Sequence, residues 1–326
     1  QDGTSAWGLS PSKYVQQAVK NVETYLKNNL DGRYKLPKRG ENPFPVDYAP
    51  EEDVTPLLEP EVATYYMQLI GILRWMCELG RIDICTEVSM LSSYSAMPRE
   101  GHLEAALHVF SYLKSKSNSR LIFDPMEPDV GDSGFVECDW SDFYPGASEA
   151  LPPNAPKPLG KGVTLRMFVD SDHAGDKVSR RSRTGFVIFL NYGMIDWLSK
   201  KQSTVETSVF GAEFCAMKHG IENLRGIRYK LRMMGIPVKG ASYVYGDNMS
   251  VVTNASKPES TLKKKSNSIC YHAVREAVAM GEALVAHIPT KKNLADLFTK
   301  VLYGQTRRFL VNRMLWDVFP GKDGHV

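Results

Sequence analysis

Residues 163–199 read VTLRMFVDSDHAGDKVSRRSRTGFVIFLNYGMIDWLS and are the most informative part of the sequence about the fold. It contains three short apolar runs, at 163–169, 184–190 and 194–199, whose β-branched and aromatic residues are typical of strands. Asn191-Tyr192-Gly193 joins the second run to the third and has the turn chemistry of a hairpin. The stretch therefore predicts three consecutive antiparallel strands.

Downstream of this meander, helical and strand patterns alternate. Helical spacing over residues 209–234 ends at Gly235 and Pro237, which are helix stop signals. Then come a strand (242–245), two helices (249–255 and 268–280), a strand (283–288) and a last helix (294–301). Strands that are reached through helices pair in parallel by crossover connections. The order βββαβααβα predicts a mixed α/β fold with a five-stranded mixed sheet flanked by helices.

The upstream part has a different pattern. Apolar residues recur at helical spacing over 14–26, 62–79, 82–94 and 103–114, without strand alternation, so we expect residues 1–123 to form a mainly helical domain. Residues 124–160 are rich in Pro, Gly and acidic residues, which predicts a linker. The expected domains are thus 1–123, this linker, an α/β domain over 161–303 and a C-terminal tail over 304–326.

Charge is distributed unevenly between these parts. Residues 1–160 hold 14 Lys or Arg against 23 Asp or Glu, whereas residues 161–303 hold 22 against 12. The α/β part is therefore a candidate polyanion binder, with a solvated basic surface as the alternative. No apolar run approaches the roughly 18 residues of a membrane span, and the first residues lack a secretion signal. We therefore expect no membrane contact. The five cysteines are odd in number and lack the spacing of a zinc site, so we also expect an intracellular, reduced protein.

Four acidic residues stand where catalysis would need them. Asp170 ends the first strand, Asp247 closes the strand YVYGD, Glu213 lies early in the long helix and Asp296 begins the last helix. Strand ends and helix starts can meet at one sheet edge, where clustered carboxylates hold divalent ions for phosphodiester cleavage. The alternative is that the three aspartates are ordinary turn or helix-start residues. Glu213 fits that alternative least, because its apolar neighbours imply burial and a buried carboxylate needs a partner.

Several linked motifs resemble one known family. FVDSDHAGDKVSRRSRTGFVIFL, SKKQSTVETSVFGAEF, YVYGDN and YHAVREAVAMGEALVAHIPTKKNLADLFTK resemble, in order, the ribonuclease H domain of copia-type retrotransposon polyproteins. The resemblance implies an RNase H-like fold over 161–303 and assigns the catalytic metal ligands to Asp170, Glu213, Asp247 and Asp296. It also implies two Mg²⁺ ions, which Mn²⁺ can replace, and an RNA–DNA hybrid as substrate.

The helical part carries a second resemblance. Residues 65–115, YYMQLIGILRWMCELGRIDICTEVSMLSSYSAMPREGHLEAALHVFSYLKS, are similar to the thumb and connection region that follows the polymerase palm in the same polyproteins. The Tyr-x-Asp-Asp motif of the polymerase is absent from this sequence, so the expected partner is a reverse transcriptase fingers and palm. Two departures from the family are Gly211, where many relatives have an acidic residue, and Lys265-Ser266-Asn267-Ser268, where many have Lys-His-Ile-Asp.

Other residues are candidates for contact with the hybrid. Arginines, lysines and hydroxyls suit phosphate contacts, which position a duplex without reading its sequence. The candidates are Arg180, Arg181, Ser182, Arg183, Lys200, Lys201, Gln202, Ser203 and Asn248. For the two basic runs, 180–183 and 200–203, the alternative is a solvated loop without a partner. His287 is a possible auxiliary residue near the last acid, although an ordinary strand histidine is the favoured interpretation.

The sequence thus predicts an endoribonuclease that cleaves the RNA strand of RNA–DNA hybrids by two-metal hydrolysis within a retrotransposon reverse transcriptase. A catalytically silent hybrid-binding or structural module of a decayed element is the alternative. A transposase or integrase is disfavoured, because such enzymes usually use three acids and carry zinc or DNA-binding modules.

Overall fold

The computed structural model describes residues 6–319 except 31–32, 39, 132 and 263–264. A five-stranded mixed sheet forms its centre, with strand order β5-β4-β3-β6-β7. The first three strands are β3 (Leu165–Asp172), β4 (Arg183–Leu190) and β5 (Gly193–Lys201), and they form the predicted antiparallel meander. β6 (Ser242–Gly246) pairs in parallel with β3, and β7 (Ala283–His287) pairs in parallel with β6. The predicted mixed five-stranded sheet is confirmed.

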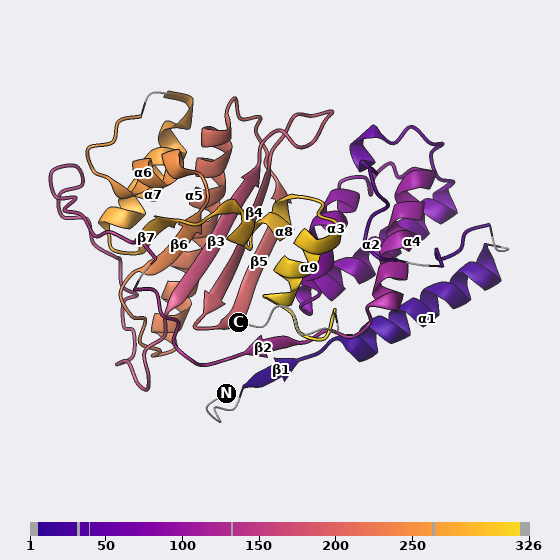
Figure 1. Cartoon of the computed structure of the whole chain (residues 1–326), viewed down its shortest axis with the longest axis horizontal. Coiled ribbons are helices and arrows are strands. Elements are labelled where there is room, and N and C mark those ends of the chain that lie inside the picture. Colours follow the sequence, from indigo (N-terminus) through magenta and orange to yellow (C-terminus); the bar gives the residue numbers. More distant parts are fainter. Residues whose placement is uncertain (1–5, 31–32, 39, 132, 263–264, 320–326) are drawn as a thin grey trace.

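One face of the sheet is covered by three helices, α5 (Val209–Met233), α6 (Met249–Ser256) and α7 (Ser268–Ala279) (Figure 1). Alternate residues of β3 explain the packing, because successive strand side chains point to opposite faces. Met167 and Val169 belong to the core under these helices, whereas Phe168 belongs to the core on the opposite face. The sheet is therefore buried on both faces, which accounts for the nearly continuous apolar runs of its strands.

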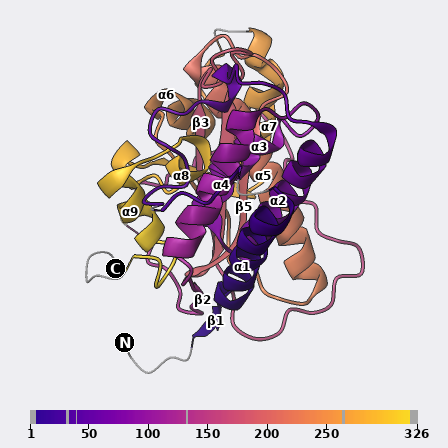
Figure 2. The ribbon, with the colours of Figure 1, turned by 90° about the vertical axis from the view of Figure 1, so that its right-hand side faces the viewer.

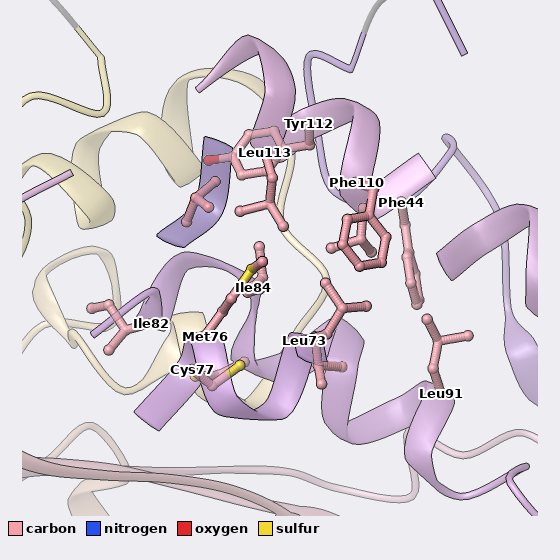
Figure 3. Packing of buried hydrophobic residues seen from close by; sticks show 14 of the residues in the cluster. Phe44, Leu73, Met76, Cys77, Ile82, Ile84, Leu91, Phe110, Tyr112 and Leu113 are labelled. Atoms are coloured by element: carbon pink, nitrogen blue, oxygen red, sulfur yellow. The ribbon is translucent and has the colours of Figure 1, made fainter. Parts of the chain in front are cut away.

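The helical part lies beyond the opposite face of the sheet and comprises α1 (Ser12–Asn29), α2 (Pro60–Glu78), α3 (Cys85–Ser92) and α4 (Glu100–Ser115). Of these helices, α3 contacts the sheet directly, at β5. Figure 2 shows α1, α2 and α4 in front of the sheet, and Figure 3 shows the side chains packed between the helices, among them Leu73, Met76, Phe110 and Leu113. The same hydrophobic core continues to Val187 and Phe189 of the sheet.

The last two helices belong to the same hydrophobic core, between the sheet and the helical part. The short α8 (Asp296–Thr299) contacts β3, β4 and β5 on one side and α3 on the other, and α9 (Gly304–Asn312) follows it beside the helical part (Figures 1 and 2). Leu310, Val311 and Leu315 of the expected tail are buried with α2–α4. The domain boundaries drawn from the sequence stay a prediction, and the hydrophobic core extends across them.

Two segments outside these layers complete the fold. The first ~120 residues are mainly helical, as expected, and they also contain two short strands that the sequence did not indicate: β1 (Trp7–Leu9) pairs with β2 (Leu121–Phe123). Strands of three residues are too short to show alternation in a sequence. Among its described residues, 124–160 forms no helix or strand, but it is anchored by Glu149, whose carboxylate accepts hydrogen bonds from Arg228 and Arg232 of α5.

Candidate metal centre

Three of the predicted acids meet at one edge of the sheet. Asp170 lies in β3, Asp247 follows β6 directly, and Glu213 lies near the start of α5. β3 and β6 are parallel neighbours, so their carboxyl ends reach the same edge. One carboxylate oxygen from each of the three residues lies within 4.8 Å of the other two. Carboxylates gathered this closely provide the hard oxygen ligands that Mg²⁺ or Mn²⁺ prefers.

The fourth acid joins this cluster through Asp170 and a lysine. Lys300 places its Nζ 2.7 Å from Oδ1 of Asp296 and 3.2 Å from Oδ2 of Asp170. Thr299 donates its hydroxyl hydrogen to the same Oδ2 of Asp170. Asp296 is not one of the three acids whose oxygens lie within 4.8 Å of one another, and its assignment as a metal ligand stays a prediction.

Burial and mutual repulsion shift the pKa values of the acids. Burial raises the pKa of Glu213 well above its usual value, and the nearby carboxylates of Asp170 and Asp247 raise it further. Burial and Asp170 raise the pKa of Asp296 to about 6, against the opposing effect of Lys300. Burial tends to lower the pKa of Lys300, but Asp170 and Asp296 outweigh it and raise that pKa. The cluster therefore has an excess of negative charge that a divalent cation would neutralise, so its donor set fits such an ion.

The helical part supports α8, the element that carries Asp296. Thr86 of α3 donates a buried hydrogen bond of 2.7 Å to the backbone carbonyl of Leu297. Within the α/β part, Asn293 donates from Nδ2 to the carbonyl of Val169, and its Oδ1 accepts from the backbone amide of Ala295. These bonds connect the backbone on both sides of Asp296 to α3 and to β3.

The structure also identifies site residues that the sequence interpretation missed, namely Thr299 and Lys300. Both lie in the quoted motif NLADLFTK, and the spacing of Lys300 from Asp296 is that of an i, i+4 ion pair. That signal was present in the sequence. It did not indicate that Lys300 would also reach Asp170, because Asp170 lies 130 positions earlier in the chain.

The predicted nucleic-acid contacts divide into exposed and buried residues. Arg180, Arg181, Lys200 and Ser203 are exposed beside the loops that follow β3 and β5. Lys201 is half-buried, with its Nζ 2.9 Å from Oδ2 of Asp176. The four exposed side chains are accessible to a polyanion, and Lys201 is partly accessible. The role of all five in nucleic-acid binding stays a prediction.

Buried positions favour structural roles for three other candidates. Ser182 accepts a hydrogen bond from the backbone amide of Ala174. Arg183 donates from Nη1 to the hydroxyls of Ser89 and Ser199, and Gln202 donates from Nε2 to Thr184 and to the carbonyl of Ala212. The Ser182 hydroxyl, the Arg183 guanidinium and the Gln202 amide nitrogen all have partners inside the protein, whereas Oε1 of Gln202 is buried without one. Contact between those three groups and phosphates would require them to exchange partners.

The remaining two candidates lie beside Asp247. Asn248 is the N-cap of α6, and its Oδ1 accepts hydrogen bonds from the amides of Ser250 and Val251. His287 is the exposed last residue of β7 and pairs with Gly246 in the parallel register. It therefore lies at the same sheet edge as Asp247, on a strand, as the favoured interpretation of the sequence expects.

Gly211 and the segment 265–268, which differ from the sequence pattern of the resembled family, lie next to each other in the structure. A Cβ atom built on Gly211 would lie 2.3 Å from Nδ2 of Asn267, and this amide donates a hydrogen bond to Glu206. A side chain larger than glycine at position 211 would therefore displace the Asn267 side chain. The two departures are compatible with each other, and neither contributes an oxygen to the acid cluster.

Comparisons with known proteins were made by sequence and by fold. No family model matches the chain. Its curated relatives include the retrovirus-related Pol polyproteins from transposon RE1 of Arabidopsis thaliana, 27% identical over 76% of this chain, and from transposon TNT 1-94 of Nicotiana tabacum, 27% identical over 73%. The chain spans only 14% and 15% of the lengths of these two relatives. Its homologues are thus Pol polyproteins of copia-type transposons.

Similar solved structures are ribonuclease H domains. LC11-RNase H1 is 20% identical with a TM-score of 0.34, and the match covers 42% of this chain and 92% of that one. The RNase H1 of Halobacterium salinarum is 14% identical with a TM-score of 0.33, and the match covers 43% and 95%.

Proposed function

We propose that this chain, a homologue of copia-type retrotransposon Pol polyproteins, contains a ribonuclease H that cleaves the RNA strand of RNA–DNA hybrids. One observation carries the proposal: Asp170, Glu213 and Asp247 come from three separate elements and place their oxygens within 4.8 Å of one another. Buried carboxylates repel, and such a cluster is stable when a cation neutralises it. Metal-dependent phosphodiester hydrolysis is the chemistry that uses this arrangement.

Divalent ions, Mg²⁺ or Mn²⁺, would be held by Asp170, Glu213, Asp247 and Asp296, and would activate water and stabilise charge on the leaving oxygen. The protein holds these ligands in place beforehand. Ser171 stabilises the ionised form of Glu213 through a backbone hydrogen bond, and Thr299 orients the carboxylate of Asp170. Asp170, Glu213 and Asp247 already lie close together, so this part of the site would be organised during folding.

Basic side chains beside the acid edge would position the hybrid. Arg180, Arg181, Lys200 and Ser203 are exposed and can reach phosphates, which orient a duplex without selecting its sequence. Preference for RNA would come from contacts to 2′-hydroxyl groups in the wide minor groove. Hydrolysis would leave 5′-phosphate and 3′-hydroxyl ends.

In its biological setting the chain would act with a reverse transcriptase polymerase. The fingers and palm of that enzyme would be the protein partner of the helical part, and reverse transcription would place the protein inside the cell, in the cytoplasm, a virus-like particle or the nucleus. No helix among the described residues is long and apolar enough to cross a membrane.

A cleavage assay with the full chain tests the proposal. With Mg²⁺ or Mn²⁺, a labelled RNA–DNA hybrid should be cut in the RNA strand, while single-stranded RNA and duplex DNA stay intact. Asp247→Asn should lower the rate by about two or more orders of magnitude, since a ligand is lost. Asp196→Asn, a half-buried acid of β5 outside the cluster, is the matched control and should cleave at the wild-type rate.

Two results would count against the proposal. If Asp247→Asn cleaves as fast as the wild-type protein, the activity does not come from this site. If the protein neither cleaves hybrids nor gains thermal stability from Mg²⁺ or Mn²⁺, the chain is a catalytically silent module.

A further inference from the structure

Lys300 bridges two of the four acids, Asp170 and Asp296. Its ammonium is 2.7 Å from Asp296 and 3.2 Å from Asp170, at the point where α8 ends. The Lys300 side chain is 35% exposed, whereas those of Asp170 and Asp296 are 2% and 11% exposed. Of these three side chains, the lysine is thus the one that solvent reaches most readily.

The four acids form two overlapping sets, each of which could hold one positive charge. Asp170, Glu213 and Asp247 form the group whose oxygens lie within 4.8 Å of one another. Asp170 and Asp296 share the ammonium of Lys300 instead. Asp170 belongs to both sets, so anything that binds between Asp170 and Asp296 competes directly with Lys300.

A divalent ion and the ammonium cannot both lie between these two acids. Mg²⁺ binds oxygen at about 2.0–2.1 Å, whereas the ammonium donates hydrogen bonds at about 2.7–3.2 Å. An ion that joined Asp170 to Asp296 would occupy the space of Nζ, and two like charges at that separation repel strongly. Asp172, a half-buried acid that interacts electrostatically with Lys300, provides a nearby acceptor for a displaced ammonium.

We propose that Lys300 takes the place of a second cation in the substrate-free protein, so that its ammonium must leave before a divalent ion can join Asp170 to Asp296. This inference rests on the proposed function. It makes Lys300 a positioning residue that sets the order of metal binding. The first ion enters at Asp170, Glu213 and Asp247 with the lysine in place, and the second binds more weakly because it displaces a charge.

Calorimetric titration of Mn²⁺ or Mg²⁺ into the full chain without nucleic acid, at a fixed neutral pH, tests this order. The wild-type protein should bind one ion and then a second more weakly. Lys300→Met should bind the second ion about tenfold or more tightly than wild type, because a charged competitor is gone. Lys300→Arg keeps a cation that can bind a carboxylate with two nitrogens, so its second ion should bind no more tightly than in the wild-type protein.

The control variant is Lys218→Met, which removes another i, i+4 lysine, 2.6 Å from Glu222 on α5 and outside the acid cluster. Both of its metal affinities should equal those of the wild-type protein. A second readout is thermal unfolding in chelator, where Lys300→Met should unfold at a lower temperature than wild type and gain more from added metal. If Lys300→Met does not fold, Lys300→Gln is titrated in the same way.

The outcomes separate this inference from the proposed function. A second-ion affinity within twofold of wild type, or weaker, in the uncharged variants overturns the role of Lys300, even if the protein cleaves hybrids. Tighter second-ion binding in those variants without hybrid cleavage would support Lys300 and overturn the nuclease. A wild-type protein that binds no divalent ion overturns both.

Discussion

Replacing Arg307 tests how the C-terminal helix is attached to the rest of the molecule. Arg307 lies on α9, and its Nη1 is 2.8 Å from Oε1 of Glu87 on α3, with both side chains 2% exposed. Its Nη2 donates to the backbone carbonyl of Asp83, and its guanidinium lies 5.5 Å from the ring centre of Tyr112. These contacts connect the segment that follows α8 to the helical part.

The structure sets the size of the effect. Burial raises the pKa of Glu87, and Arg307 acts against that rise. Arg307→Met would leave Glu87 buried without its partner, which typically costs 3–5 kcal/mol. Because the total stability of a domain is about 5–15 kcal/mol, this loss should be easy to measure. Glu87 can reduce the loss by taking up a proton, so the penalty should become smaller as the pH falls below neutrality.

Urea unfolding followed by circular dichroism measures this penalty. The control is Arg308→Met, the exposed neighbour on the same helix, which should change the free energy of unfolding by less than about 0.5 kcal/mol. The double variant Glu87→Gln with Arg307→Met should lose less than the sum of the single variants, since it leaves no unpaired charge. A loss below about 1 kcal/mol for Arg307→Met, or additive effects, would refute the argument that this pair holds α9 in place.

Two further predictions concern neighbouring contacts. Gly185→Ala should destabilise the protein by about 1–3 kcal/mol and weaken metal binding, because the new Cβ would lie 2.6 Å from Cγ2 of Thr299 and 2.9 Å from Cβ of Phe298. Thermal unfolding and metal titration measure the two effects. An unchanged melting temperature would contradict this prediction. Asp83 is fully buried, and although burial opposes the shift, Arg81 and its hydrogen bonds lower the pKa of Asp83 below its usual value of 3.8. A lowered acid pKa gives stability that is present above the unfolded pKa and lost as the pH falls through the folded one. The cost of Asp83→Asn, measured by unfolding at several pH values, should therefore be constant near neutrality and shrink below pH 3.8; a constant cost at low pH would contradict this.

Gly185 and Lys300 illustrate the limit of predicting the site from the sequence. That Asp170, Glu213 and Asp247 lie near strand and helix ends could be inferred, because local apolar patterns locate those ends and parallel pairing brings them together. Asp170 was expected to end its strand, but β3 continues through Asp172, where it still pairs with Arg183 of β4. The contact of Lys300 with Asp170 and the close approach of Gly185 to α8 depend on how α8 packs on the sheet. No local pattern encodes that packing.

Local patterns in the sequence were sufficient to predict the order of the elements in the α/β part, its mixed sheet and the acids near strand ends, since strand alternation, helical spacing and turn residues act over a few neighbouring positions. That α8 packs on the second face of the sheet and shares a hydrophobic core with the helical part and α9 became clear from the folded structure. The folded structure also decided that Arg183 and Gln202 are buried and that a lysine lies between two of the acids. These features arise from contacts between residues far apart in the chain, where packing and charge pairing outweigh local preference.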